Sequence, residues 1–133
     1  MITLDTSALL ALADRDDRDH GPANAALEAD PGPYVIPAGV LGEAGYMLER
    51  LGRLALSEFL RDLEEGRLTY DPGERDFGRI GALLERYEDL GLGLADAAVI
   101  ACAERHGGLV LTTDRRDFRV VAGEGRIRLL LDG

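Results

Sequence analysis

Short apolar runs alternate with longer segments of helical periodicity along this chain. The short runs predict strands, and the segments in which apolar residues recur every three or four positions predict helices. Predicted strands cover residues 1–5, 34–36, 68–70, 109–113 and 127–131. Predicted helices cover residues 7–13, 20–29, 38–51, 54–65, 74–89 and 94–105, and residues 14–19 form an acidic loop.

This alternation of strands and helices predicts an α/β fold. The predicted strand 109–113 is apolar on both faces, which is typical of a parallel sheet that helices cover on both sides. We therefore expect one domain over residues 1–133, a three-layer α/β/α sandwich with a central, mainly parallel sheet. Ligands bind beyond the carboxyl ends of such strands. Asp5 and Asp114 each follow a predicted strand, so we expect the two carboxylates to lie close together.

A third carboxylate interrupts the apolar face of a predicted helix. That face of helix 38–51 is marked by Val40, Ala44, Met47 and Leu51. Glu43 lies within the same stripe, three residues after the first member and four before the third, so its side chain is predicted to be buried. A buried glutamate without a partner costs several kcal/mol or takes up a proton. Its position therefore favours a functional role.

Asp96 lies near the start of the most apolar helix of the chain. An aspartate there caps backbone N–H groups and interacts favourably with the helix dipole, so this residue has a purely structural explanation. Turn and capping roles are equally available to Asp5 and Asp114. Carboxylates that share one cleft, however, usually coexist by sharing a divalent cation or a proton. The sequence thus leaves two explanations open, separate capping residues or one metal site.

Composition limits the chemistry further. All fifteen basic residues are arginine, which excludes a phosphate-binding loop lysine and Schiff-base catalysis. The formal net charge is −10, which by itself disfavours a nucleic-acid partner. Two bound divalent ions would offset the charge of four clustered acids, and an acidic surface attracts a basic protein partner. Charge alone therefore leaves the substrate open.

The remaining reactive side chains have structural interpretations. Cys102 lies in the apolar run 97–103, so we expect a buried structural thiol. His20 lies near a helix start and His106 in the last turn of a helix, and we interpret neither as a metal ligand. The chain has no apolar run long enough to span a membrane and no signal-peptide pattern, so we expect a cytoplasmic protein.

The order of the acidic motifs is more specific than any single residue. Asp5-Thr6-Ser7 closes the first strand, Glu43 follows on a helix, and then come Leu94-Ala95-Asp96-Ala97-Ala98 and Leu111-Thr112-Thr113-Asp114-Arg115-Arg116-Asp117-Phe118. This order resembles the PIN-domain family, and specifically the VapC-type toxin ribonucleases of toxin–antitoxin pairs. The resemblance extends from residue 2 to residue 131.

The resemblance implies a Mg²⁺- or Mn²⁺-dependent endoribonuclease. The positions that match the metal-binding acids of the family are Asp5, Glu43, Asp96 and Asp114, with Asp117 as a further acid that some members use. Hydroxyl groups that match positions near the site are Thr6, Ser7 and Thr112. Arginines that follow the last acid and are candidates for contacts with phosphate are Arg115, Arg116 and Arg119; charge balance around the acids is the alternative.

The resemblance also implies partners. Family members are inhibited by an antitoxin with a basic segment and commonly form homodimers; here the first two helices and residues 38–65 would form the antitoxin groove. Two alternatives stay open, namely a PIN-fold nuclease in RNA processing outside such a pair, and a catalytically silent PIN-fold binding module. A haloacid-dehalogenase-type phosphatase is improbable, because that class needs an aspartate two residues after the first and Ser7 stands there.

Overall fold

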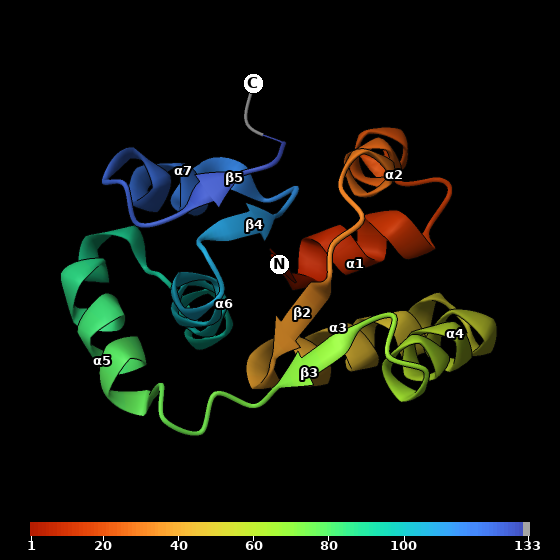
Figure 1. Cartoon of the computed structure of the whole chain (residues 1–133), viewed down its shortest axis with the longest axis horizontal. Helices are drawn as coiled ribbons and strands as arrows, with labels where there is room; N and C mark the ends of the chain where they lie inside the picture. Colours follow the sequence, from red (N-terminus) through yellow and green to blue (C-terminus); the bar gives the residue numbers. More distant parts are fainter. Residues whose placement is uncertain (132–133) are drawn as a thin grey trace.

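The computed structural model describes residues 1–131 and contains a five-stranded sheet with helices on both sides (Figure 1). The strands are β1 (Ile2–Leu4), β2 (Tyr34–Pro37), β3 (Thr69–Asp71), β4 (Leu109–Leu111) and β5 (Arg128–Leu129). The helices are α1 (Thr6–Ala13), α2 (His20–Ala29), α3 (Ala38–Leu51), α4 (Arg53–Glu64), α5 (Phe77–Arg86), a 3₁₀ turn at Glu88–Leu90, α6 (Leu94–Arg105) and α7 (Arg115–Gly123). Residues 132 and 133 of the expected domain lie outside the described part.

The strand order is β3-β2-β1-β4-β5, and each neighbouring pair is parallel. The chain moves from β1 towards β3 first and then crosses to β4 and β5. Because crossover connections between parallel strands are right-handed, this reversal sends α1–α4 to one face and α5–α7 to the other (Figure 1). The predicted three-layer sandwich with a parallel sheet is confirmed. The reversal places β1 and β4 side by side, so the residues after both strands meet at one edge.

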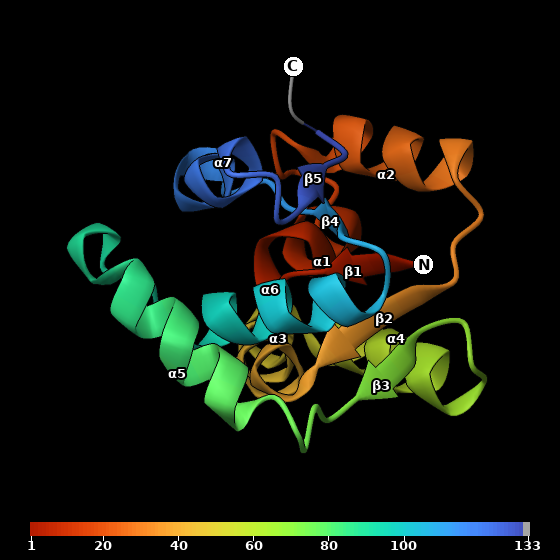
Figure 2. The same ribbon diagram turned by 60° about the vertical axis from the view of Figure 1, so that its left-hand side comes forward.

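Helix α6 packs along the middle of the sheet (Figure 2). Seven successive residues from Ala97 to Ala103 are buried, because this helix contacts the sheet on one side and both α3 and α5 on others. Four of the seven are alanine, which lets the neighbouring backbones approach closely. At Gly39 of α3, a Cβ atom would lie 3.2 Å from the Cα atom of Ala95. This close approach brings the first turns of α3 and α6 together.

Several predicted boundaries differ from the structure. Helix α7 was not predicted, although Phe118, Val121 and Ala122 have helical spacing and the first two are buried. The last strand is shorter than predicted, since β5 covers two residues. No helix within residues 1–131 is long and apolar enough to cross a lipid bilayer.

Candidate metal centre at the carboxyl edge of the sheet

The four main acids predicted from the sequence line one cavity of about 150 Å³. Asp5 follows β1, Asp114 follows β4, Asp96 lies in the first turn of α6, and Glu43 lies on α3. Residues far apart in the sequence therefore meet where the carboxyl ends of the two central strands face the first turns of these helices. The expected proximity of Asp5 and Asp114 is confirmed, because both line the same cavity.

Asp5 is both a helix cap and a member of the cavity. Its carboxylate is 5% exposed and accepts three hydrogen bonds. Oδ1 accepts from the backbone N–H of Ala8 at 3.0 Å and from the Ser7 hydroxyl at 2.7 Å, while Oδ2 accepts from the Thr112 hydroxyl at 2.6 Å. Burial raises its pKa above the ordinary value, although these hydrogen bonds oppose the shift. Asp5 therefore caps α1 and also lines the acidic cavity, so the capping explanation and the metal-site explanation are compatible at this residue.

Two hydroxyl groups join the ends of β1 and β4. Ser7 Oγ accepts from the backbone N–H groups of Thr113 at 3.0 Å and Asp114 at 3.2 Å while it donates to Asp5. Thr112 Oγ1 accepts from the N–H of Asp114 at 3.1 Å while it donates to Asp5. The expected positions of both hydroxyls near the acids are confirmed. They fix the backbone of Asp114 relative to the carboxylate of Asp5.

Asp96 is half-buried and makes no capping hydrogen bond at the start of α6, where Gly93 is the N-cap. Its pKa is raised to about 6, first by burial and then by the negative charges of Asp5, Asp114, Glu43 and Asp117. Asp96 is therefore not the N-cap of α6, although its place in the first turn still allows the favourable interaction with the helix dipole. Its carboxylate instead experiences the combined charge of the other acids.

The predicted burial of Glu43 is wrong, because its side chain is exposed. The buried face of α3 consists of Val40, Ala44 and Leu48, spaced four residues apart, whereas Met47 and Leu51 are 42% and 44% exposed. A stripe at this spacing excludes Glu43, which lies beside it at the rim of the cavity. Glu43 still lines the acidic cavity, but it does so from the rim, a position that helical periodicity did not predict.

The other candidate residues occupy different positions around the cavity. Asp117 lies in the first turn of α7, and its charge contributes to the raised pKa of Asp96. Thr6 lines the cavity, and its buried hydroxyl has no hydrogen-bond partner within residues 1–131. Arg115 donates through Nη1 to the backbone carbonyl of Leu131 at 2.6 Å, so part of its guanidinium is engaged away from the acids. Arg116 is exposed.

Three helices begin at this cavity. Asp5 and Asp114 are the N-cap residues of α1 and α7, and Asp96 lies in the first turn of α6. Each helix N-terminus has a partial positive charge that stabilises nearby carboxylates, by about 0.3–1 kcal/mol where the site is exposed. This contribution is smaller than the repulsion among several carboxylates in a half-buried cavity. Protonation of one acid or a bound cation would balance the remaining charge.

The donor set of the cavity fits a hard divalent cation. Its acidic and hydroxyl side chains offer oxygen atoms only, and oxygen is the ligand that Mg²⁺ and Mn²⁺ prefer. Within residues 1–131, the acids of this cavity are not among the groups whose ligand atoms already converge closely enough to hold an ion directly. Mg²⁺ usually keeps several waters and takes one or two carboxylates. The wider spacing therefore suits an ion that retains part of its water shell.

A second cluster was missed in the sequence. Asp71, Cys102 and His106 have ligand atoms that lie within 4.8 Å of one another. The sequence analysis did not interpret His106 as a metal ligand, yet Cys102 precedes it by four residues and His106 caps the C-terminal end of the same helix. That spacing places both side chains on one face of α6, and it was the signal available in the sequence. The predicted burial of Cys102 is confirmed.

Known proteins resemble this chain over most of its length. The model of the PIN domain matches residues 2–124. Ribonuclease VapC26 of Mycobacterium tuberculosis is 30% identical over 132 residues, which cover 96% of this chain and 98% of that protein.

Solved structures share the fold. The crystal structure of M. tuberculosis VapC20, described as a sarcin-ricin loop cleaving toxin, superposes with a TM-score of 0.75 at 25% identity and covers 91% of this chain and 95% of that chain. A chain of a toxin–antitoxin complex from Klebsiella pneumoniae superposes with a TM-score of 0.75 at 23% identity, with full coverage of both chains. The second likeness supports the fold alone.

We expect Asp96→Asn to stabilise the metal-free protein near neutral pH. The pKa of Asp96 is about 6 in the folded chain, against about 3.9 when unfolded. The folded state therefore binds this proton more tightly, so stability falls as pH rises from about 4 to about 6. This difference in pKa corresponds to about 3 kcal/mol, which the partial exposure of Asp96 reduces to about 1 kcal/mol.

Urea denaturation in the presence of a chelator measures this effect. Asp96→Asn should gain stability over wild type at about pH 7.5 and lose most of that gain near pH 4. Asp89→Asn replaces an exposed acid outside the cavity and serves as the matched control. Its free energy of unfolding should equal that of wild type at both pH values. An Asp96→Asn variant that is no more stable than wild type at neutral pH would contradict the electrostatic account.

Proposed function

This chain belongs to the PIN domain family, and we propose that it is a Mg²⁺- or Mn²⁺-dependent endoribonuclease that acts as the toxin of a toxin–antitoxin pair. The observation that supports this most strongly is the convergence of Asp5, Glu43, Asp96 and Asp114 on one cavity. The relative VapC26 is named a ribonuclease and is 30% identical over nearly the whole chain. VapC20, at 25% identity, is described as a toxin that cleaves the sarcin-ricin loop.

Asp5, Asp96 and Asp114 are the residues that would hold the metal, with Glu43 at the rim and Asp117 in the first turn of α7. A bound divalent ion supplies Lewis acidity for the hydrolysis of a phosphodiester, for which we expect 5′-phosphate and 3′-hydroxyl products. No histidine or serine nucleophile is required. The side chains of the protein would then position the oxygen ligands and keep them ionised.

The hydrogen bonds around Asp5 provide that positioning. Three donors hold its carboxylate in one orientation, and two of them, Ser7 and Thr112, also bind the backbone of Asp114. The distance between two proposed ligands is thus set by side chains that are not ligands themselves. Asp96 has no such partner, and the neighbouring acids raise its pKa, so a bound cation would favour its ionised form.

RNA must approach this site against a net charge of −10. Among residues 1–131, no arginine lines the acidic cavity, and Arg116 is exposed two positions after Asp114. We therefore propose that the metal site provides most of the attraction for phosphate, with few arginine contacts. The affinity for RNA should then depend less on salt concentration than the affinity of strongly basic RNA-binding proteins does, because fewer counterions are released from the RNA.

An apolar groove supports an antitoxin partner. A cavity of about 310 Å³ lies between α1 and α2 on one side and the α3–α4 hairpin on the other. Leu12, Leu27 and Ala55 contribute apolar surface and Glu58 adds negative charge, whereas Asp62 is paired with Arg67 at 2.8 Å. A segment that combines apolar side chains with basic ones would match this lining.

A homodimer remains part of the proposal. Large apolar side chains are exposed along α3 and the start of α4: Tyr46, Met47, Leu51 and Leu54. Exposed apolar residues that follow one another along a surface are typical of protein interfaces. We propose this stripe as the surface through which two copies would associate. The catalytically silent alternative is disfavoured, since the cavity retains its full set of acids.

We expect Asp5→Asn, Asp96→Asn and Asp114→Asn each to reduce RNA cleavage by about 100-fold or more, because each would remove a proposed ligand. Glu43→Gln should have a smaller effect, since this side chain lies at the rim. Cleavage of a labelled RNA with Mn²⁺ or Mg²⁺ under single-turnover conditions measures the rates. Asp89→Asn is the control and should cleave like wild type. Equal rates for wild type and Asp96→Asn would overturn the proposed function.

We expect Glu58→Arg to weaken binding of the antitoxin about tenfold and to leave RNA cleavage unchanged. The substitution reverses a charge in the proposed groove but lies outside the acidic cavity. Binding to the purified cognate antitoxin, measured by calorimetry, tests this effect. Glu85→Arg reverses an exposed charge on α5 and is the matched control. An unchanged affinity for Glu58→Arg would argue against this groove.

A further inference from the structure

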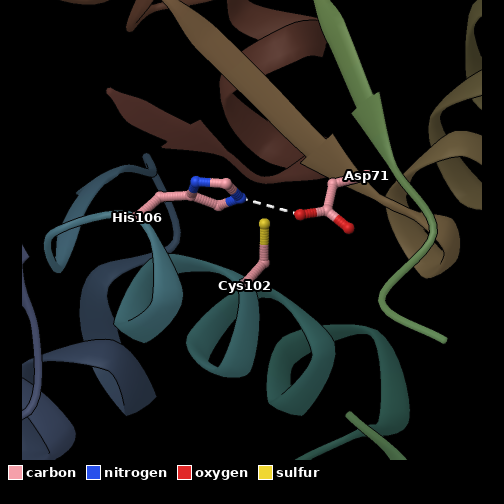
Figure 3. Close-up of side chains that lie close together, drawn as sticks. All are labelled: Asp71, Cys102 and His106. Carbon is pink, nitrogen blue, oxygen red and sulfur yellow. Dashed lines mark hydrogen bonds and ion pairs between the residues drawn. The ribbon is translucent and has the colours of Figure 1, made fainter. Parts of the chain in front are cut away.

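A thiol, an imidazole and a carboxylate converge near the C-terminal end of α6 (Figure 3). Cys102 belongs to α6, His106 is the C-cap residue that follows the helix, and Asp71 is the last residue of the edge strand β3. The ten residues between Asp96 and His106 correspond to about 15 Å along a helix axis, at 1.5 Å per residue. The cluster is thus separate from the acidic cavity.

The backbone brings these three side chains together. Cys102 and His106 are four residues apart and therefore project from the same face of the helix. Asp71 faces them from β3, and the backbone N–H of Gly73 holds its Oδ1 atom at 2.9 Å. Its Oδ2 atom lies 2.7 Å from Nε2 of His106. All three ligand atoms lie within 4.8 Å of one another.

We propose that Asp71, Cys102 and His106 form a binding site for a borderline-soft divalent cation, best matched by Zn²⁺, with a fourth position open to solvent. A mixed set of sulfur, nitrogen and oxygen ligands selects Zn²⁺ over Mg²⁺, which takes oxygen ligands. The side chains of His106 and Asp71 are 26% and 18% exposed, which gives the ion and a water molecule access. Cys102 forms the buried wall of the site.

The ligand atoms, which lie within 4.8 Å of one another, would adjust their separations to bind the ion. In a tetrahedral Zn²⁺ site the nitrogen and oxygen ligands lie about 3.3 Å apart, and nitrogen and sulfur about 3.6 Å. The pair formed by His106 and Asp71 would open by roughly half an ångström as the ion takes the place of the proton between them, and neutral His106 would then carry its one proton on Nδ1. The thiol of Cys102 loses its proton to solvent when the sulfur–metal bond forms. Thiolate and carboxylate together then balance the double positive charge.

Neighbouring residues provide the outer support of this site. Arg105 donates through Nη1 to Oδ2 of Asp71 at 2.7 Å, which would compete with a cation. It also binds Asp76 through two further nitrogens, Nε and Nη2, each at 2.8 Å, and Asp76 is 6% exposed. Arg105 therefore keeps its ion pair with Asp76 when the ion binds Asp71.

The buried hydroxyl of Thr3 donates to Sγ of Cys102 at 3.9 Å, a contact that would support a thiolate ligand. A role for Cys102 as a nucleophile is disfavoured, because burial raises the pKa of its thiol to about 11. Metal binding would instead join β3 to the end of α6 without using any residue of the acidic cavity.

Cobalt spectroscopy on the full chain tests the proposal, because Co²⁺ substitutes for Zn²⁺ and its bond to a thiolate gives a charge-transfer absorption in the near ultraviolet. The chain contains one cysteine, so this absorption reports Cys102 alone. We expect one equivalent of Co²⁺ to produce the absorption, an excess of Zn²⁺ to remove it, and an excess of Mg²⁺ to leave it unchanged. Zn²⁺ should also raise the melting temperature.

His106→Gln should weaken Co²⁺ binding at least about tenfold, and its half-exposed position makes folding of this variant secure. Cys102→Ser should abolish the absorption, with circular dichroism as the check on its fold. Asp96→Asn, which alters the acidic cavity, is the matched control and should keep both absorption and affinity. Co²⁺ binding without the thiolate absorption, or equal affinity in wild type and His106→Gln, would overturn the proposal.

Discussion

Electrostatic repulsion among carboxylates at one edge of the sheet is the constraint around which this structure is organised. Parallel strands β1 and β4 place Asp5 and Asp114 together, and α6 adds Asp96, whose pKa is raised to about 6 by burial and by the other acids. Three helix N-termini and the hydroxyls of Ser7 and Thr112 offset part of this repulsion. A divalent cation would neutralise the remaining negative charge. The same carboxylates that destabilise the metal-free protein would therefore provide its affinity for metal.

Helix α6 connects the two proposed sites and shows how packing serves both. Its buried alanines allow close contact with the sheet and with α3, which brings Asp96 and Glu43 to the same cavity. Its C-terminal end presents Cys102 and the C-cap residue His106 towards Asp71 (Figure 3). The donor atoms differ at the two ends. Oxygen ligands at the first turn suit Mg²⁺ or Mn²⁺, and the mixed ligands at the last turn suit Zn²⁺. A chain without lysine and with two histidines could thus bind two classes of cation.

Much of the fold and part of the site could be predicted from the sequence. The apolar run before Asp114 identified a buried parallel strand, and strand polarity then placed Asp5 beside it. The burial of Glu43 was predicted wrongly because a helical period of 3.6 residues allows either of two neighbouring stripes of side chains to be the buried one. Packing of α3 against α1 and α6 selects the stripe that contains Leu48. Helix α7 was missed because its arginines and its short length obscured the spacing of Phe118 and Val121. Asp96 drew its functional interpretation from family resemblance, since capping alone would have explained it.

The central claim is that Asp5, Asp96 and Asp114 form a single metal site. Anomalous X-ray diffraction from crystals grown with Mn²⁺ tests it most directly. The account predicts a strong anomalous peak in the acidic cavity, within bonding distance of at least one of these carboxylates, and loss of that peak in crystals of Asp96→Asn. A cavity without manganese at concentrations that support RNA cleavage, or an unchanged peak in the variant, would contradict the account.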